Sequence, residues 1–182
     1  MRAVTQTPPS PFASTPAMLD PGSPGESTPE VATWSSYEDP LVGFGFQYPS
    51  NWYINQPANA PDSILNYAVI LSNQPGNISP QGRTDNETVR LTISYARDQI
   101  SPLELWIATN WTGLGSEIVA ANLSSLQGWS YSQPTVLSPG TYTIFWGTQD
   151  NQYYVVESYA STNGTDDVML REILSTLYFL DD

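Results

Sequence analysis

The chain of 182 residues contains no cysteine, no histidine and no lysine, and its basic side chains are five arginines. The absence of cysteine excludes disulfides, thiolate nucleophiles and zinc–thiolate or iron–sulfur sites. Without histidine or lysine the chain cannot form a Ser-His-Asp triad, a Ser-Lys dyad or a Schiff base. Carboxylates are therefore the only acid–base groups present in number, and the sequence favours a protein that is not an enzyme.

Charge is scarce and almost all of one sign. Charged residues make up 13% of the chain, and the formal net charge is −13. This charge disfavours anionic membrane surfaces and argues against nucleic acids as partners, because no basic cluster offsets the repulsion. No run approaches the roughly 20 apolar residues of a membrane helix, and the N-terminus lacks the apolar centre of a signal peptide. The sequence therefore predicts no integral membrane segment in this chain.

The polar residues are mainly Ser, Thr, Asn and Gln, a composition that is common in secreted proteins. Adaptation to low pH gives the same bias. We expect an extracytoplasmic protein, either secreted or anchored through a lipid or signal anchor missing from this chain. The alternative is a cytoplasmic location without any export signal.

Residues 1–32 differ in composition from the rest of the chain. They contain seven prolines, two glycines and eight Ser or Thr, which leaves too little apolar surface to offset the entropy of ordering. The composition predicts a disordered Ser/Thr/Pro-rich stalk that acts as a spacer, with a passive tail as the alternative. Residues 33–182 are predicted to form the folded domain.

Short strands are predicted from residue 33 onward. In Glu87–Tyr95, apolar and polar residues alternate and indicate one buried face. In Gly43–Tyr48, the side chains of Phe44, Phe46 and Tyr48 share one face and are expected in the core. A hairpin turn is predicted at Asp150-Asn151. The other predicted strands are Thr33–Tyr37, Trp52–Asn55, Tyr67–Ser72, Ser125–Gln133, Thr141–Gly147 and Gln152–Ala160.

Two helices are predicted. The first starts at Ser101-Pro102-Leu103-Glu104, a capping-box pattern with Ser101 as N-cap, and runs to about Asn110. The second is capped by Thr165 and is expected to bury the apolar residues Val168, Leu170, Ile173, Leu174 and Leu177. Antiparallel strands with one mid-chain and one terminal helix predict an α+β layered domain.

Asp166 and Asp167 are explained by the dipole at the start of the second helix rather than by a catalytic or calcium site. No calcium-loop spacing is present in the chain. We therefore expect neither a metal nor a cofactor.

Six tryptophans and eleven tyrosines raise the hypothesis of carbohydrate binding, because flat aromatic rings stack on sugars. Most of these rings are better explained as core, since they alternate along predicted strands. Trp111 follows a helix and Trp129 lies in a polar stretch, so these two are the candidate ligand-binding residues.

The segment "GFGFQYPSNWYINQ" at residues 43–56 resembles the opening of PsbP-like domains of the Mog/PsbP type, as found in bacterial lipoproteins. Two further features agree with the resemblance: "SSLQGWSYS" leads into "TYTIFW" and "QYYVVESY", and "LREILSTLYFL" is similar to the closing helix of the family. The resemblance covers residues 33–180. It implies an antiparallel sheet flanked by helices, an α/β/α sandwich, in accessory or binding proteins without enzymatic activity.

The resemblance transfers no functional residue. Photosynthetic members use histidines and lysines at metal sites and for docking, and these have no counterpart here. We therefore expect a non-catalytic extracytoplasmic domain that is tethered by a flexible stalk and binds a protein or envelope partner. The alternatives are a carbohydrate-binding module that uses exposed Trp and Tyr, and a hydrolase that uses carboxylates alone.

Overall fold

The computed structural model describes residues 33–59, 63–75, 87–114, 117–135, 139–162 and 164–180. The predicted stalk at residues 1–32 lies outside the described residues. The elements, in chain order, are β1 Trp34–Asp39, β2 Phe44–Pro49, β3 Tyr53–Asn55, β4 Asn66–Ser72, β5 Val89–Ala96, α1 Leu103–Asn110, β6 Val119–Leu123, β7 Leu126–Pro134, β8 Gly140–Gln149, β9 Gln152–Ser161, α2 Gly164–Ser175 and β10 Tyr178–Phe179.

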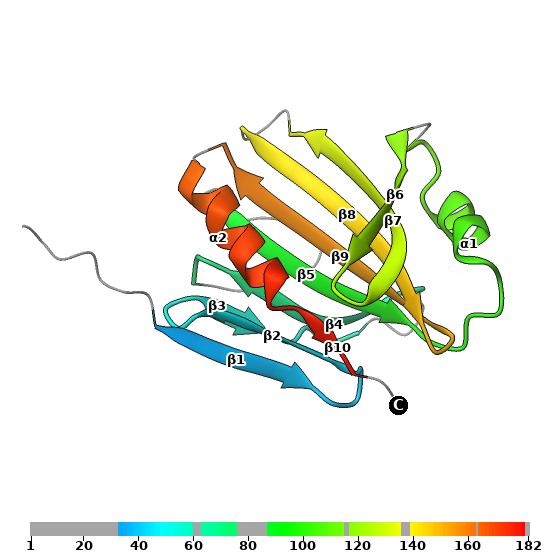
Figure 1. The fold of residues 1–182 in the computed structure, drawn as a ribbon, viewed down its shortest axis with the longest axis horizontal. Helices are drawn as coiled ribbons and strands as arrows, with labels where there is room; N and C mark the ends of the chain where they lie inside the picture. Colours follow the sequence, from blue (N-terminus) through cyan, green and yellow to red (C-terminus); the bar gives the residue numbers. More distant parts are fainter. Residues whose placement is uncertain are drawn as a thin grey trace, which may run out of the picture. The chain divides into compact units, whose positions relative to one another are not determined.

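The described strands form two antiparallel sheets (Figure 1). The larger sheet has seven strands in the order β3-β4-β5-β9-β8-β7-β6, and the smaller sheet has three in the order β1-β2-β10. The predicted turn joins β8 to β9, and both of its central residues, Asp150 and Asn151, have positive φ angles of 50° and 60°. Such angles at both positions match the hairpin turns that fit the right-handed twist of strands.

One face of the larger sheet is covered by α2 together with the smaller sheet. Phe44 and Phe46 of β2 are 0% and 1% exposed, and they pack in the same core as Ile173 of α2 and Leu91 of β5. This confirms the prediction that the aromatic residues of the β2 segment face the core. Figure 1 shows α2 crossing the sheet near β5 and β9, which both contact it.

The opposite face carries a second core beneath α1. Successive residues of β9 separate the two cores, since Tyr154 and Val156 belong to the first whereas Tyr153 and Val155 belong to the second. The two helices thus lie on opposite faces of the larger sheet. The antiparallel α+β architecture is confirmed, and the α/β/α sandwich stays a prediction because the smaller sheet shares the first face with α2.

The structure corrects both helix starts. Pro102 is the N-cap of α1, with φ −56° and ψ 141°, and no side chain caps the helix, so the predicted capping box does not form. The predicted end at Asn110 is confirmed. Helix α2 begins at Gly164, which places Thr165 inside the helix rather than at its cap. Val168, predicted to be buried, is 55% exposed because it faces away from the sheet.

Two strands were not predicted. β6 precedes β7 and joins it through a tight turn in which Ser124 has a φ of 54°. β10 follows α2 and pairs with β2, so the closing segment is a helix followed by a short strand. Gly45 is buried because Tyr178 of β10 lies over it, and a Cβ atom there would come within 2.3 Å of the Tyr178 hydroxyl. Tyr178 therefore covers the face of β2 on which Gly45 lies.

Candidate functional site

Helix α1 is held on the sheet by aromatic contacts. Trp106 is buried and meets Tyr153 of β9 edge-on, with 4.9 Å between the ring centroids. Trp111 directly follows the helix, and its ring lies 5.0 Å from that of Trp106 and 5.5 Å from that of Trp146. Aromatic rings that meet edge to face stabilise a fold beyond what the burial of their surface contributes. Trp111 is therefore fixed in place by two buried indoles.

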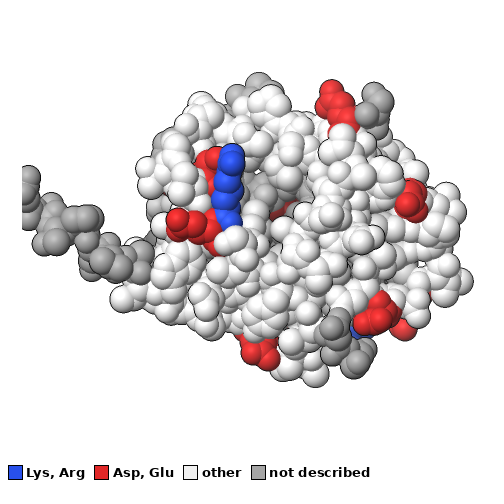
Figure 2. Space-filling model, viewed as in Figure 1, with Lys and Arg blue, Asp and Glu red and all other residues white. Residues whose placement is uncertain are grey.

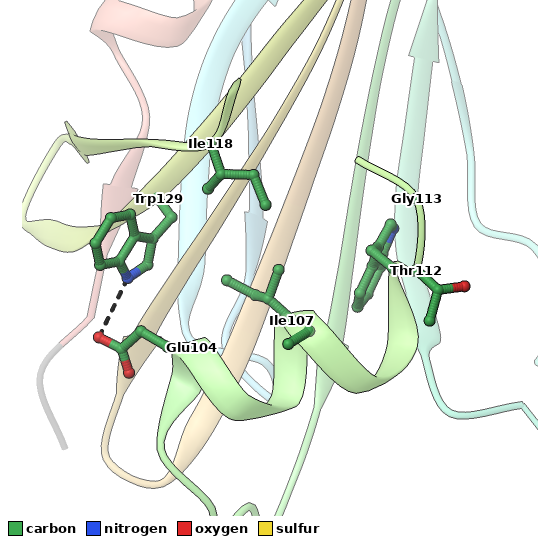
Figure 3. A pocket seen from close by; sticks show the side chains of 8 residues that line it. Glu104, Ile107, Thr112, Gly113, Ile118 and Trp129 are labelled. Atoms are coloured by element: carbon green, nitrogen blue, oxygen red, sulfur yellow. Dashed lines mark hydrogen bonds between the residues drawn. The ribbon is translucent and has the colours of Figure 1, made fainter. Parts of the chain in front are cut away.

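A pocket of about 400 Å³ opens between α1 and the β6–β7 hairpin. Figure 3 shows Trp129 at one end, Thr112 and Gly113 at the other, and Ile107 and Ile118 between them. The pocket is lined by Glu104, Ile107, Ala108, Trp111, Thr112, Gly113, Ile118 and Trp129. Its volume lies within the usual range for pockets that bind small ligands or side chains.

The two candidate residues of the sequence, Trp111 and Trp129, thus line one pocket although 18 positions separate them. Trp129 reaches the pocket from β7, where it pairs with Trp146 of β8. Both candidate indoles are half-buried. They form walls of a concave site, whereas a sugar-binding module of the predicted kind presents flat, exposed rings.

Among the described residues, Glu104 is the only charged one that lines the pocket. Its carboxylate accepts a hydrogen bond from the indole N–H of Trp129, with 3.3 Å between Nε1 and Oε1 (Figure 3). Glu104 was predicted to serve in a capping box and was not predicted as a site residue. Sequence reasoning missed it because its partner comes from a strand 25 residues further along the chain.

A second hollow, of about 530 Å³, lies beside α2 on the opposite face of the sheet. Its lining is rich in hydroxyl groups, and Ser132 and Thr143 are joined by a hydrogen bond of 2.8 Å. From α2 it receives Asp167 and Arg171, which form an exposed ion pair of 2.6 Å. Figure 2 shows one basic group over α2, flanked by acidic groups, with a hollow beside it.

A buried polar cluster occupies the part of the sheet next to the α1 core. Arg90 of β5 forms an ion pair of 3.3 Å with Glu87, and the two side chains are 8% and 1% exposed. The alternating pattern of this strand predicted one buried face, yet both faces are buried, including Thr92 and Ser94. β5 lies in the interior of the larger sheet, and the sequence pattern shows only the apolar face of such a strand.

Within this cluster, Tyr142 of β8 donates a hydrogen bond to Glu157 of β9. Burial raises the pKa of Tyr142, and the charge and hydrogen bond of Glu157 raise it further. Burial and the same carboxylate also raise the pKa of Tyr67. Both phenols therefore remain neutral over the physiological pH range, and Tyr142 supports the sheet through its hydrogen bond rather than acid–base chemistry.

The described part of the chain contains neither a cluster of acidic metal ligands nor a membrane-spanning helix. No group of three or more Asp or Glu side chains is placed there to hold a metal ion. Of the helices described, neither has the length and apolar character to span a bilayer.

The fold is similar to that of cyanobacterial PsbP (CyanoP) from Synechocystis, whose solution structure matches 87% of this chain and 98% of its own, with a TM-score of 0.50 and 12% identity. A crystal structure of a Bacteroides thetaiotaomicron protein matches 81% of this chain with a TM-score of 0.51 and 13% identity. This chain spans about half, 48%, of that protein. The fold is therefore PsbP-like, as the resemblance in sequence predicted.

A third structure is that of LpqN of Mycobacterium tuberculosis, a protein involved in cell envelope biogenesis. It matches 85% of this chain and 88% of its own at 12% identity, and its TM-score of 0.44 is too low to support an argument. No family model matches the sequence, and no curated protein matches it either. The similarity concerns the fold alone, so function has to be argued from the site.

Proposed function

We propose that residues 33–182 form a non-catalytic binding domain that engages a protein partner through the pocket between α1 and the β6–β7 hairpin. The observation that carries this proposal is the convergence of Trp111 and Trp129 on one concave, mainly apolar site. Tryptophan is enriched among the residues that dominate the energy of protein interfaces, and its large ring loses little entropy on binding. The pocket walls also need little reorganisation, because Trp111 already packs against Trp106 and Trp146.

Two other functions are less well supported by the geometry. A carboxylate-only hydrolase needs two facing carboxyl groups roughly 5–9.5 Å apart in one cleft. The α1 pocket has Glu104 alone, and the carboxylate in the α2 hollow is paired with Arg171. A carbohydrate-binding module remains the second candidate because the site contains two indoles, although both are half-buried.

The proposal also covers the cellular location of this domain. We infer an extracytoplasmic location, with residues 1–32 as a flexible spacer that holds the domain away from an envelope surface. The Ser/Thr/Pro composition of that segment and the surplus of uncharged polar residues in the chain support this inference. Protease treatment of intact cells tests the location: loss of the protein while cytoplasmic markers survive is expected, and full protection overturns the inference.

Site-specific photo-crosslinking tests the binding function. A benzophenone side chain replaces Thr112, which is exposed at the pocket, or Ser175, which is exposed on α2. The full-length chain is irradiated with an envelope extract, and the adducts are identified by mass spectrometry. We expect one protein adduct that depends on the Thr112 position and is lost in Trp129→Leu. Equal labelling from both positions, or adducts only with polysaccharide, would overturn the proposal.

A further inference from the structure

The charge distribution of the α1 pocket points to the chemistry of its occupant. Resting on the proposed function, we infer that the pocket takes a basic side chain of the partner, with the cationic group at Glu104 and Trp129 and the apolar stem over Ile107 and Ile118. Among the lining residues no other charged group is present. The pocket therefore has one negative end and an otherwise neutral, apolar length.

Glu104 has capacity to accept further hydrogen bonds. A carboxylate offers about four lone-pair sites. The one bond found for Glu104 in the described residues is from the Trp129 indole, at 3.3 Å, and both ion pairs found there use other carboxylates, those of Glu87 and Asp167. Glu104 is also exposed, so an incoming donor reaches it without displacing a buried group. This carboxylate is the natural anchor for a cation.

Trp129 adds the second element of cation recognition. Its N–H is directed to Glu104, so the carboxylate lies at the edge of the ring. The face of an indole attracts cations through its quadrupole, and tryptophan is the strongest of the aromatic side chains in this respect. A guanidinium group suits both partners because it stacks on aromatic faces and forms paired hydrogen bonds with a carboxylate. The site therefore favours Arg over Lys.

The length of the pocket argues for a side chain rather than a small free cation. Figure 3 shows Ile107 and Ile118 between Trp129 and the Thr112–Gly113 segment. The methylene stems of Arg and Lys lie along apolar surfaces while their heads stay with polar groups, which is the pattern that this lining offers. An apolar neighbour in the partner then covers the Trp111 end.

The charge of the whole chain acts in the same direction. A net charge of −13 with no lysine repels acidic partners and attracts basic ones over distances set by the ionic strength. Electrostatic complementarity of this kind increases association rates and selects partners. We therefore expect a basic surface on the partner around the inserted side chain.

The test uses the full-length chain and four acetylated, amidated tripeptides of sequence Leu-X-Leu, in which X is Arg, Lys, citrulline or Glu. Citrulline keeps the shape of Arg and removes its charge. Binding is followed by calorimetry and by the indole N–H resonances in ¹H–¹⁵N spectra, assigned with Trp→Phe variants. We expect Arg to bind best, Lys next, citrulline roughly tenfold or more weaker than Arg, and Glu not at all. Added salt should weaken the Arg peptide and leave citrulline unaffected.

Two variants carry the same change of charge at different places. Glu104→Gln removes the carboxylate of the pocket, and we expect it to lower the affinity for the Arg peptide to that for the citrulline peptide. Glu172→Gln removes an exposed carboxylate of α2, on the other face of the sheet, and should leave the affinity unchanged. Circular dichroism confirms that both variants fold.

The outcomes separate this inference from the proposed function. If the Arg and citrulline peptides bind equally, or if Glu104→Gln and Glu172→Gln behave alike, the cation inference is overturned. A protein adduct at Thr112 would then still support the proposed function. If no peptide shifts the Trp129 resonance, the cation inference likewise falls. Absence of a protein adduct at Thr112 refutes the proposed function on its own.

Discussion

The α1 pocket and the α2 hollow lie on opposite faces of the same sheet, and they differ in how their charges are satisfied. In the α2 hollow, Asp167 is neutralised by Arg171 one helical turn away, at 2.6 Å. In the α1 pocket, Glu104 accepts one indole N–H and no ion pair to it is found in the described residues. A carboxylate that is neutralised within its own helix offers little to a partner, whereas Glu104 beside Trp129 offers both charge and an aromatic face.

The two helices also differ in how they are attached to the domain. Helix α2 extends over twelve residues and places Ile173 in the larger core, where that side chain is fully buried. Helix α1 extends over eight residues, has no side-chain cap and is held mainly through Leu103, Trp106 and Ile107. We therefore expect the α2 face to contribute more to folding, and we propose the α1 face for recognition.

The largest effect is expected from the core beneath α2. Ile173→Ala removes a fully buried side chain and should lower the free energy of unfolding by about 2–5 kcal/mol. The matched change Ile118→Ala, in the wall of the α1 pocket, should cost about 1 kcal/mol because Ile118 is only half-buried. Urea denaturation measures the free energy of unfolding of both variants, and the two can be compared if their m-values are equal. Equal losses for the two variants would contradict the division between a folding face and a binding face.

More of the fold than of the candidate site could be predicted from the sequence. The alternation of Phe44 and Phe46 with small or polar neighbours predicted their burial, because period-two spacing is a local property of strands. β6 was missed because its turn contains serines, with Ser124 at positive φ, in place of the usual Gly or Asn. The start of α1 was predicted one residue too early, because the capping box was assigned from residue types alone. The extended backbone of Pro102 makes Leu103 the first helical residue.

Two residues of the candidate pocket were singled out from the sequence, and their role in binding stays a prediction. Trp111 and Trp129 were singled out because the first follows a helix and the second lies in a polar stretch, and both line the pocket. Their convergence depends on the packing of α1 across β8 and β7, which no short-range pattern encodes. Glu104 was assigned to the helix cap for the same reason, since its contact with Trp129 is a tertiary one. Local patterns therefore identified unusual residues but did not show which of them meet.

An intermediate effect is expected in the buried polar cluster, which belongs to neither hollow. Tyr142→Phe removes the donor to Glu157 and should cost about 1–2 kcal/mol at neutral pH. Burial first, and then Glu157, raises the pKa of Tyr142 above its usual value of 10.0, while Arg90 acts in the opposite direction. The native state therefore holds the neutral phenol, and the unfolded chain ionises it near pH 10.

The stabilisation from Tyr142 is thus fully present below about pH 10 and is lost as the pH rises from there toward the higher pKa of the folded state. The pKa of Tyr67 is raised as well, so more than one phenol contributes to the pH dependence of wild-type stability. The difference in stability between wild type and Tyr142→Phe isolates the contribution of Tyr142. Urea titrations at a series of pH values measure this difference. A stability gap between wild type and Tyr142→Phe that stays constant from pH 8 to well above about pH 10 would contradict the assignment.

The smallest effect is expected at the α2 hollow, and it tests the comparison between the hollows directly. Arg171→Gln breaks the ion pair with Asp167. The side chains of Arg171 and Asp167 are 75% and 47% exposed, so the free energy of unfolding should fall by only about 0.3–0.5 kcal/mol. The same change frees a carboxylate beside a hydroxyl-lined hollow. If a free carboxylate were sufficient to capture a cation, Arg171→Gln would create a second binding site for the Leu-Arg-Leu peptide. We expect calorimetry to show one site before and after the change, because the α2 hollow has no indole on which the guanidinium can stack.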